Sequence, residues 1–330
     1  MSTAATVLIP THDHGRTLLR SVPSALAQTV SELEVFVVGD GVPDETRELM
    51  AQLAAADERV RFFDNPKGER HGEAHRHAAL QEARGEIVCY LSDDDVWLPN
   101  HVEELQRLLA DADLAHTLSF AIDPDDRLQV VRLDLAREHF RGVLVAGDSR
   151  IHLSITGHTT ELYRRLPGGW RPTPEGIYTD LYLWQRLLAL PGTRAASGTR
   201  PTMLHFPSHL RDGWSTEQRL AEIDRWQESG MADALPQRLL DNVLRDRAGL
   251  DEALTNRERE VEMLSARLAL VEQQAAEQHA QLQAIADSVT WRLRGRLRRV
   301  PGLRAAARAL AGPAAPATAE RRDHDRRPEP

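Results

Sequence analysis

A short apolar segment that ends in three consecutive acids constrains this chain more than any other feature. Residues 85–91 form an apolar run of strand length, and Asp93, Asp94 and Asp95 follow it closely. Pro99 then opens a stretch with apolar residues at helical spacing. We therefore expect the acids on a loop between a buried strand and a helix, where α/β sheets place their ligands.

Adjacent carboxylates repel one another. A pair at about 4 Å costs about 1 kcal/mol in water and several times more in a cleft. A divalent cation converts this repulsion into binding, and hard oxygen ligands suit Mg²⁺ or Mn²⁺. A helix N-cap with spare solvated acids is the alternative interpretation, and these residues alone leave both open.

The composition permits a large core and excludes several classes of protein. The 330 residues are 41% hydrophobic, which suits one large domain with appendages. A net charge of −9 argues against a nucleic-acid binder. Cys89 is the single cysteine, so no internal disulfide can form and a reducing compartment fits. We see neither a signal peptide nor an apolar stretch of about 20 residues, and we expect a cytoplasmic location.

Residues 1–120 alternate segments of strand and helix character. The expected strands are residues 7–9, 33–38, 60–63 and the acidic strand, and the expected helices are residues 18–28, 43–56 and 72–83. This order predicts a mainly parallel, doubly wound sheet with right-handed crossovers.

Residues 121–205 are less regular. The expected elements in and after this stretch are helices at residues 180–189 and 211–228 and a strand at residues 202–206.

The C-terminal part carries a seven-residue repeat. Apolar residues recur at Leu254, Val261, Leu268, Ala275, Leu282 and Val289, with Leu250, Leu264, Val271 and Ile285 at the interleaved positions. Only Arg257 and Gln278 interrupt the pattern. About five heptads predict a coiled coil, and we expect a homo-oligomer through residues 250–290.

A basic segment follows the repeat. Residues 291–312 hold seven arginines and no acids, and Trp and Leu are interleaved with the arginines at its start. This pattern is typical of an interfacial helix on an anionic membrane leaflet. A solvated end of the coil, or a patch for an acidic partner, are the alternatives. The Ala/Pro-rich and then charged residues 313–330 are expected to be disordered.

Six blocks in the first two thirds of the chain share a pattern with one enzyme family. They are residues 7–11, 24–29, 34–41, 72–85, 92–99 and 179–186. In this order they resemble the opening strand, the first helix, the second strand with its acidic loop, the helix before the metal motif, the DXD region and the catalytic helix of family 2 glycosyltransferases.

The resemblance implies a GT-A fold, which is an α/β, Rossmann-like fold with a mainly parallel sheet and flanking helices. Here a C-terminal coiled-coil helix would follow it. The expected organisation is a GT-A domain at residues 1–245 (nucleotide-binding half 1–120, acceptor half 121–245), a coiled coil at 246–290, a basic amphipathic segment at 291–312 and a disordered tail at 313–330.

The resemblance also implies an activity. A sugar would move from a nucleoside-diphosphate donor, which we expect to be UDP-linked, to a hydroxyl of a glycan or lipid-linked acceptor, with inversion and with Mg²⁺ or Mn²⁺. Such an enzyme would serve cell-surface polysaccharide biosynthesis and lie peripherally at the inner membrane face. Elementary chemistry agrees, because one carboxylate within about 3 Å of the acceptor hydroxyl suffices for a single displacement, whereas a retaining hydrolase needs a second.

Residue roles follow position by position from the resemblance. Pro10, Thr11 and Asp40 would bind the nucleotide base, Asp93 the ribose and Arg76 a phosphate, while Asp94 would ligate the metal, with Asp95 as a ligand or as support and His205 as a further ligand. Asp180 would be the general base. Trp170, which follows two glycines, would stack on the acceptor.

Several of these residues have an ordinary structural alternative. Asp180 could cap its helix, and Asp40 could belong to a simple Asp-Gly turn. His205 could be a surface or core histidine, Arg76 need not meet a phosphate, and aromatic residues such as Trp170 more often fill a core.

The sequence also departs from the family pattern. Gly39 stands where many members have a second acid, Ser92 where Asp is common and His77 where Asn is common. The division of roles among the three acids therefore stays open. A zinc site at His71, His75 and His77 is not expected, because only the first two share a helix face and no cysteine joins them.

The sequence fits two rival functions less well. A nucleotidyltransferase needs a Gly-rich phosphate loop with a basic residue near the N-terminus, and residues 11–16 match such a loop poorly. A non-catalytic coiled-coil scaffold could retain a GT-A fold, but the presence of Asp40, the triple acid and Asp180 argues against it.

Overall fold

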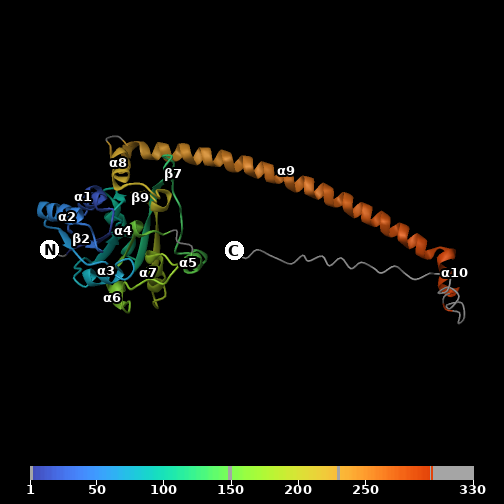
Figure 1. Ribbon diagram of the computed structural model, residues 1–330, viewed down its shortest axis with the longest axis horizontal. Helices are drawn as coiled ribbons and strands as arrows, with labels where there is room; N and C mark the ends of the chain where they lie inside the picture. Colours follow the sequence, from blue (N-terminus) through green and yellow to red (C-terminus); the bar gives the residue numbers. More distant parts are fainter. Residues whose placement is uncertain (1–2, 148–150, 229–230, 298, 300–330) are drawn as a thin grey trace. The chain divides into compact units, whose positions relative to one another are not determined.

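The computed structural model describes residues 3–147, 151–228, 231–297 and 299. The chain divides into two compact units, Met1–Asp246 and Arg247–Pro330, and each is described by itself (Figure 1). Part of the expected basic segment, residues 300–312, and the expected disordered tail, residues 313–330, lie outside the described residues.

Parallel strands and their connecting helices form the first half of the N-terminal unit. The elements are β1 (Ala5–Thr11), η1 (Gly15–Thr17), α1 (Leu18–Leu26), β2 (Leu33–Gly39), α2 (Asp44–Ala56), β3 (Val60–Phe63), α3 (Glu73–Leu80) and β4 (Ile87–Tyr90). The strands lie in the order β3-β2-β1-β4 and all pair in parallel. Helices cover this sheet (Figure 1), so that β1, β2 and β4 are almost wholly buried.

The second half of the unit continues the same sheet with mixed pairing. Its elements are β5 (Val96–Trp97), α4 (His101–Leu109), β6 (Leu114–Ile122), β7 (Leu128–Gln129), α5 (Glu138–Val145), η2 (Leu153–Ile155), β8 (Thr156–Thr159), α6 (Thr160–Arg165), α7 (Thr179–Leu188), β9 (Ala195–His205), η3 (Ser208–Leu210) and α8 (Thr216–Gln227). Strand β8 is antiparallel to both β4 and β6, whereas β9 is parallel to β6. The expected α/β fold is confirmed, with its run of parallel strands in the first half.

Two differences from the sequence expectation affect the acidic loop and helix α8. The acidic loop leads first into the short strand β5, which pairs antiparallel with β9 through Val96 and Leu204, and only then into α4. The last helix of the domain begins at Thr216 and not at residue 211, because Gly213 has a φ of +79° and Ser215 forms a capping box. The acidic loop is thereby fixed at both ends by strands.

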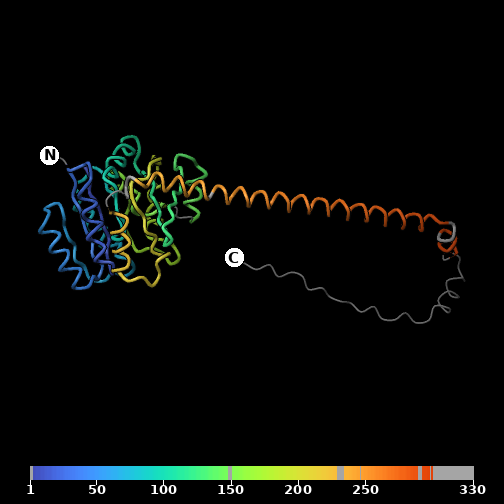
Figure 2. The backbone as a smooth tube through the Cα atoms, turned by 90° about the horizontal axis from the view of Figure 1, so that it is seen from above, coloured from blue at the N-terminus to red at the C-terminus, as the bar shows by residue number. Residues whose placement is uncertain are grey.

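Helix α8, near the end of the N-terminal unit, packs against the first elements of that unit. Figure 2 shows the blue N-terminal elements on one side of the domain and the green elements on the other, with the yellow helix α8 beside the blue ones. Helix α8 packs on η1 and α1, and Arg20 of α1 pairs with Asp224 of α8. This packing brings the segment after β9 to the mouth of the first β–α loop.

The C-terminal elements are helical. Helix α9 (Met231–Asp287) continues from the first unit into the second, and α10 (Val289–Leu297) follows. The expected long C-terminal helix is thus confirmed. None of the helices in the described part of the chain combines the length and the apolar composition that crossing a bilayer requires.

Candidate active site

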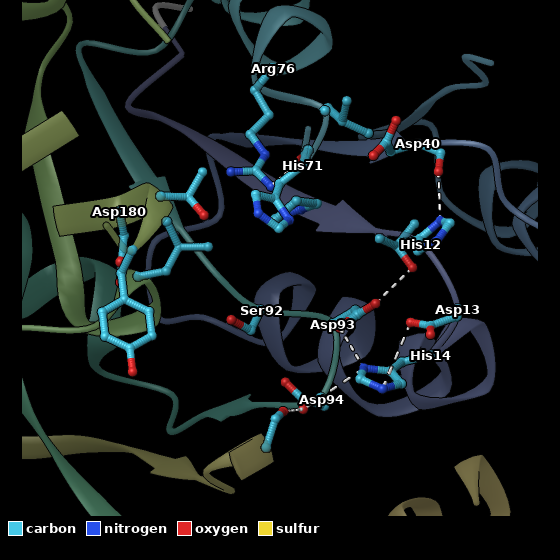
Figure 3. Close-up of a pocket in the computed structure, with 18 of the residues that line it drawn as sticks. His12, Asp13, His14, Asp40, His71, Arg76, Ser92, Asp93, Asp94 and Asp180 are labelled. Carbon is cyan, nitrogen blue, oxygen red and sulfur yellow. Dashed lines mark hydrogen bonds and ion pairs between the residues drawn. The ribbon is translucent and has the colours of Figure 1, made fainter. Parts of the chain in front are cut away.

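A cavity of about 920 Å³ opens at the carboxyl ends of the parallel strands. Among the residues predicted from the sequence, those on its wall are Pro10, Thr11, Asp40, Arg76, Asp93, Asp94, Asp180 and His205. Figure 3 labels Asp40, Arg76, Asp93, Asp94 and Asp180 among them. Asp95 and Trp170 are not on the wall. The sheet explains the gathering, because the carboxyl ends of β1, β2 and β4 share one edge.

Asp40 is held in place at the end of β2. Its carboxylate accepts hydrogen bonds from Lys67 Nζ at 2.6 Å and from the backbone N–H of Gly68 at 2.5 Å. Burial opposes ionisation, but these two donors keep the pKa of Asp40 below its ordinary value. Gly72 permits this geometry, because its φ is +74° and a Cβ there would lie 2.9 Å from Asp40 Cβ. Asp40 is therefore a fixed, anionic acceptor on the cavity wall.

The first β–α loop meets the acidic loop. Thr11 Oγ1 donates a hydrogen bond to Asp93 Oδ2 at 2.7 Å. The ring of His14 lies 3.7 Å from Asp93 Oδ1 and 4.0 Å from Asp94 Oδ2. Contact with Asp93 raises the pKa of His14 to about 9, although burial opposes the rise and the charge of Asp94 adds to it. A protonated imidazole therefore offsets the charge of two neighbouring carboxylates.

The negative charge of Asp94 is poorly stabilised in this structure. Burial, followed by repulsion from Asp95 and Asp93, raises its pKa to about 6. Ser208 Oγ donates to Asp94 Oδ2 at 2.6 Å, and a guanidinium nitrogen of Arg219 lies 3.5 Å from the same oxygen. Positive charge near Asp94 would therefore favour its ionised form.

Asp95 turns away from the cavity and organises the segment that follows β9. It is 1% exposed, and it accepts hydrogen bonds from Ser154 Oγ at 2.5 Å, His205 Nδ1 at 2.9 Å and the backbone N–H of Phe206 at 3.0 Å. Burial opposes ionisation of Asp95, but the charge of His205 holds its pKa below the ordinary value. The geometry favours Asp95 as the carboxylate that orients His205, and not as a direct ligand.

Two groups of donors in the described residues could hold a metal ion. One comprises His14, Asp93 and Asp94, and the other comprises Asp95, His152 and His205. Within each group the donor atoms lie within 4.8 Å of one another. The first group, with two carboxylates on the cavity wall, matches the oxygen-rich set that Mg²⁺ and Mn²⁺ prefer. Because both oxygens of Asp95 already accept hydrogen bonds, the second group is less open.

Asp180 lies on the opposite side of the cavity from Asp40 and His14 (Figure 3). It sits in the first turn of α7, where its Oδ1 accepts the N–H of Leu181 at 2.8 Å. Burial raises its pKa, while the charge of Arg76 opposes that rise. A carboxylate with a raised pKa is a stronger base, so Asp180 is suited to taking a proton.

A match to a family model contains these elements. Residues 6–165 match the family model described as glycosyl transferase family 2, and this stretch holds β1, β2, β4 and the acidic loop. This domain belongs to glycosyl transferase family 2. The match and the topology together confirm the GT-A fold that the sequence predicted.

Named relatives resemble part of this chain. An uncharacterized glycosyltransferase of Nostoc sp. is 33% identical over 126 residues, which are 37% of this chain and 38% of that protein. The UDP-Glc:α-D-GlcNAc-diphosphoundecaprenol β-1,3-glucosyltransferase of Escherichia coli is 30% identical over 97 residues, 29% of this chain and 37% of that protein. The chain therefore spans less than two fifths of the length of either relative.

A solved structure is also similar to the family 2 domain. It is the crystal structure of S. aureus TarS 1-349 in complex with UDP-GlcNAc. The two chains are 14% identical, with a TM-score of 0.49 over 73% of this chain and 71% of the other.

The acceptor assignment of Trp170 is wrong for this family 2 domain. Its side chain is 2% exposed and packs edge-on against Tyr90 and Trp184 at ring-centroid distances of 5.7 and 6.5 Å. An indole that is enclosed in the core cannot stack on an acceptor sugar. Its ring instead lies 4.9 Å below the guanidinium of Arg76, and so it supports a residue of the cavity wall.

Several residues of the family 2 site were missed from the sequence. They are His14, Lys67, Ser208 and Arg219. His14 had a usable signal, because it follows β1 as closely as the acids follow β4. Ser208 and Arg219 had none, since they reach Asp94 from beyond β9, more than 110 positions along the chain.

Proposed function

We propose that this chain transfers a sugar from a nucleoside-diphosphate donor to a hydroxyl group of a glycan or lipid-linked acceptor. One observation carries the proposal. A single cavity holds a fixed acceptor for a nucleotide at Asp40, a pair of carboxylates at Asp93 and Asp94, and a separate basic carboxylate at Asp180. Membership of glycosyl transferase family 2 supports it.

The donor would occupy the wall formed by the first two strands. Pro10, Thr11 and Asp40 would contact the base, and Asp93, oriented by Thr11, would hold the ribose. Arg76 would face the diphosphate, because its guanidinium is fixed by the carbonyl of His71 at 2.7 Å while its Nε has no partner among the described residues. The name of the Escherichia coli relative supports a UDP-linked donor.

Asp94, with Asp93 and His205, would hold Mg²⁺ or Mn²⁺. The donor set fits, since burial and repulsion leave the charge of Asp94 poorly stabilised and Asp95 fixes the ring of His205. A bound cation would neutralise the charge that develops on the departing diphosphate. Ser208 and Arg219 would keep Asp94 oriented.

Asp180 would act on the acceptor. The acceptor oxygen bonds to the anomeric carbon while its proton passes to Asp180. At the same time the bond from that carbon to the phosphate oxygen breaks, and the electron pair leaves with the nucleoside diphosphate. A single displacement of this kind inverts the anomeric configuration.

The acceptor side has an aromatic residue that can replace Trp170 in this role. Tyr178 lines the cavity two residues before Asp180 and is 71% exposed. Exposed aromatic faces suit stacking on a sugar ring. The name of the Escherichia coli relative, which includes a diphosphoundecaprenol acceptor, supports a lipid-linked acceptor here.

The basic helix α10 supports contact with a membrane. Leu293 and Leu297 lie one turn apart and are 53% and 52% exposed, and Arg292, Arg294 and Arg296 surround them. We expect the protein to float with vesicles of phosphatidylglycerol and phosphatidylcholine, and replacing the three arginines by glutamine should abolish this. Equal binding to vesicles of phosphatidylcholine alone would contradict an anionic surface as the target.

Metal affinity should depend on pH through Asp94. Because protons compete with the cation for this carboxylate, and its pKa is about 6, we expect the affinity for Mn²⁺ to weaken as the pH falls through that value. Below about pH 6 it should fall about tenfold per pH unit. His14, with a pKa of about 9, stays protonated across this window and adds no change. Calorimetric titration with Mn²⁺ in the presence of UDP checks this, and a level affinity down to pH 5 would contradict it.

The proposed function is tested by a panel of nucleotide sugars with and without Mn²⁺. Thermal unfolding identifies the donor first, because a ligand at 100 times its Kd stabilises the folded state by about 2.7 kcal/mol. Release of the nucleoside diphosphate in the presence of lipid-linked glycans then tests transfer. A well-folded protein that binds no nucleotide sugar under any of these conditions would exclude the proposal.

A further inference from the structure

Helix α9 carries an apolar stripe that nothing covers in the described part of the chain. We call this stripe the seam, and its members are Leu250, Leu254, Val261, Leu264, Leu268, Val271, Leu282 and Ile285. All eight side chains are between 52% and 67% exposed. When Arg257, Ala275 and Gln278 are included, successive positions are alternately four and three residues apart, which places them on one face of the helix.

A single helix in water would leave the seam exposed. Helices of globular proteins average about 11–12 residues, whereas α9 has 57. Most helical stability in proteins comes from packing of an apolar face and not from intrinsic propensity. An apolar stripe of this length, interrupted by polar residues only at Arg257 and Gln278, therefore indicates an interface with another helix.

We propose that the seam pairs with the seam of a second copy of this chain, as a parallel coiled coil in register. The seam repeats with one period along its whole length, so two copies match each other at every layer. Charges at the flanks also match. In a parallel pair Arg267 of one copy lies beside Glu272 of the other, five residues further on, and this happens twice by symmetry.

The two polar interruptions of the seam favour the parallel orientation. Arg257 already pairs with Glu260 at 2.7 Å, and Glu258 is its neighbour. In a parallel pair the arginine layer is thus flanked by acids from both copies, and Gln278 meets Gln278 of the second copy. In the antiparallel pairing that buries the whole seam, Arg257 would lie opposite Leu282, and residues 278–286 contain no acid.

Sedimentation of the full chain tests the pairing. Two 37.0 kDa chains should sediment as one dimer. Leu268→Lys should raise the dissociation constant by at least about 100-fold, because two unpaired charges enter one apolar layer. Leu270→Lys is the matched control, since Leu270 is 55% exposed, as Leu268 is 59%, but lies off the seam. A monomeric wild-type protein, a larger oligomer, or equal effects of the two variants would overturn the proposal.

Cysteine cross-linking tests the orientation. Leu254→Cys and Leu282→Cys should each give a disulfide-linked dimer on mild oxidation, because each residue meets its own copy in a parallel pair. The native Cys89 is fully buried in β4 and does not compete. If the single variants fail to cross-link, and a mixture of Leu254→Cys with Ile285→Cys succeeds, the coil is antiparallel and the proposed orientation is wrong.

Discussion

Asp180→Asn is expected to lower the rate of sugar transfer by about 100-fold or more while leaving the affinity for the donor nucleotide unchanged. The amide has the shape of the carboxylate but cannot take a proton from the acceptor. The fold should tolerate it, because an amide oxygen can still accept the hydrogen bond from the Leu181 N–H. Donor binding should survive, because Asp40 lies on the opposite side of the cavity (Figure 3). Steady-state transfer and calorimetric binding of UDP measure the two effects separately.

Glu175→Gln is the matched control for this variant. Glu175 belongs to the same loop, but its side chain is 93% exposed and its ion pair with Arg70 is 3.8 Å long. Removing this carboxylate should leave both transfer and binding near wild type. If Asp180→Asn kept more than about a tenth of the transfer rate, a different group would have to accept the proton.

The donor half of the site could be predicted because strand ends determine it. Parallel register places Leu8 beside Tyr90, so the third residue beyond each, Thr11 and Asp93, come into contact. The same logic brings Asp40 to this edge, since Thr11 pairs with Gly39. A sequence with clear β–α alternation fixes these neighbours once the strands and their order are known.

Other parts of the site depend on packing that a sequence pattern does not reveal. Trp170 follows two glycines and was expected to stack on the acceptor, yet its indole is enclosed by Tyr90 and Trp184. Arg219 reaches Asp94 only because α8 folds back onto the N-terminal elements. Neither the direction of a side chain in a loop nor the docking of a late helix leaves a local signal.

The position of Asp95 within the acidic run also could not be predicted from the sequence. Three consecutive aspartates look equivalent in the sequence, but the pairing of β5 with β9 turns the last of them inward, against His205 and Phe206. The roles of the acids therefore differ because of a two-residue strand that no pattern predicted. This difference makes separate substitutions of the acids informative.

We expect Asp94→Asn to remove the Mn²⁺-dependent part of UDP binding, with a loss of affinity of at least about 100-fold. Loss of a residue that merely supports a metal ligand lowers the metal affinity by about 10–100-fold. Because Asp94 is proposed as a direct ligand, its loss should cost at least as much affinity. The amide keeps the volume of the carboxylate and can still accept the hydrogen bond from Ser208. Binding of UDP measured with and without Mn²⁺ isolates the metal-dependent term.

Asp13→Asn provides the comparison for Asp94→Asn. Asp13 also lines the cavity and lies 3.8 Å from His14, but its side chain is 73% exposed. Loss of this carboxylate should leave the Mn²⁺ effect intact, because water screens an exposed charge. Asp95→Asn should act differently again, by lowering the thermal stability, since a buried acceptor of three hydrogen bonds is altered. If Asp94→Asn and Asp13→Asn showed the same response to Mn²⁺, the buried acid would not be the metal ligand, and the second donor group around His205 would become the site to test.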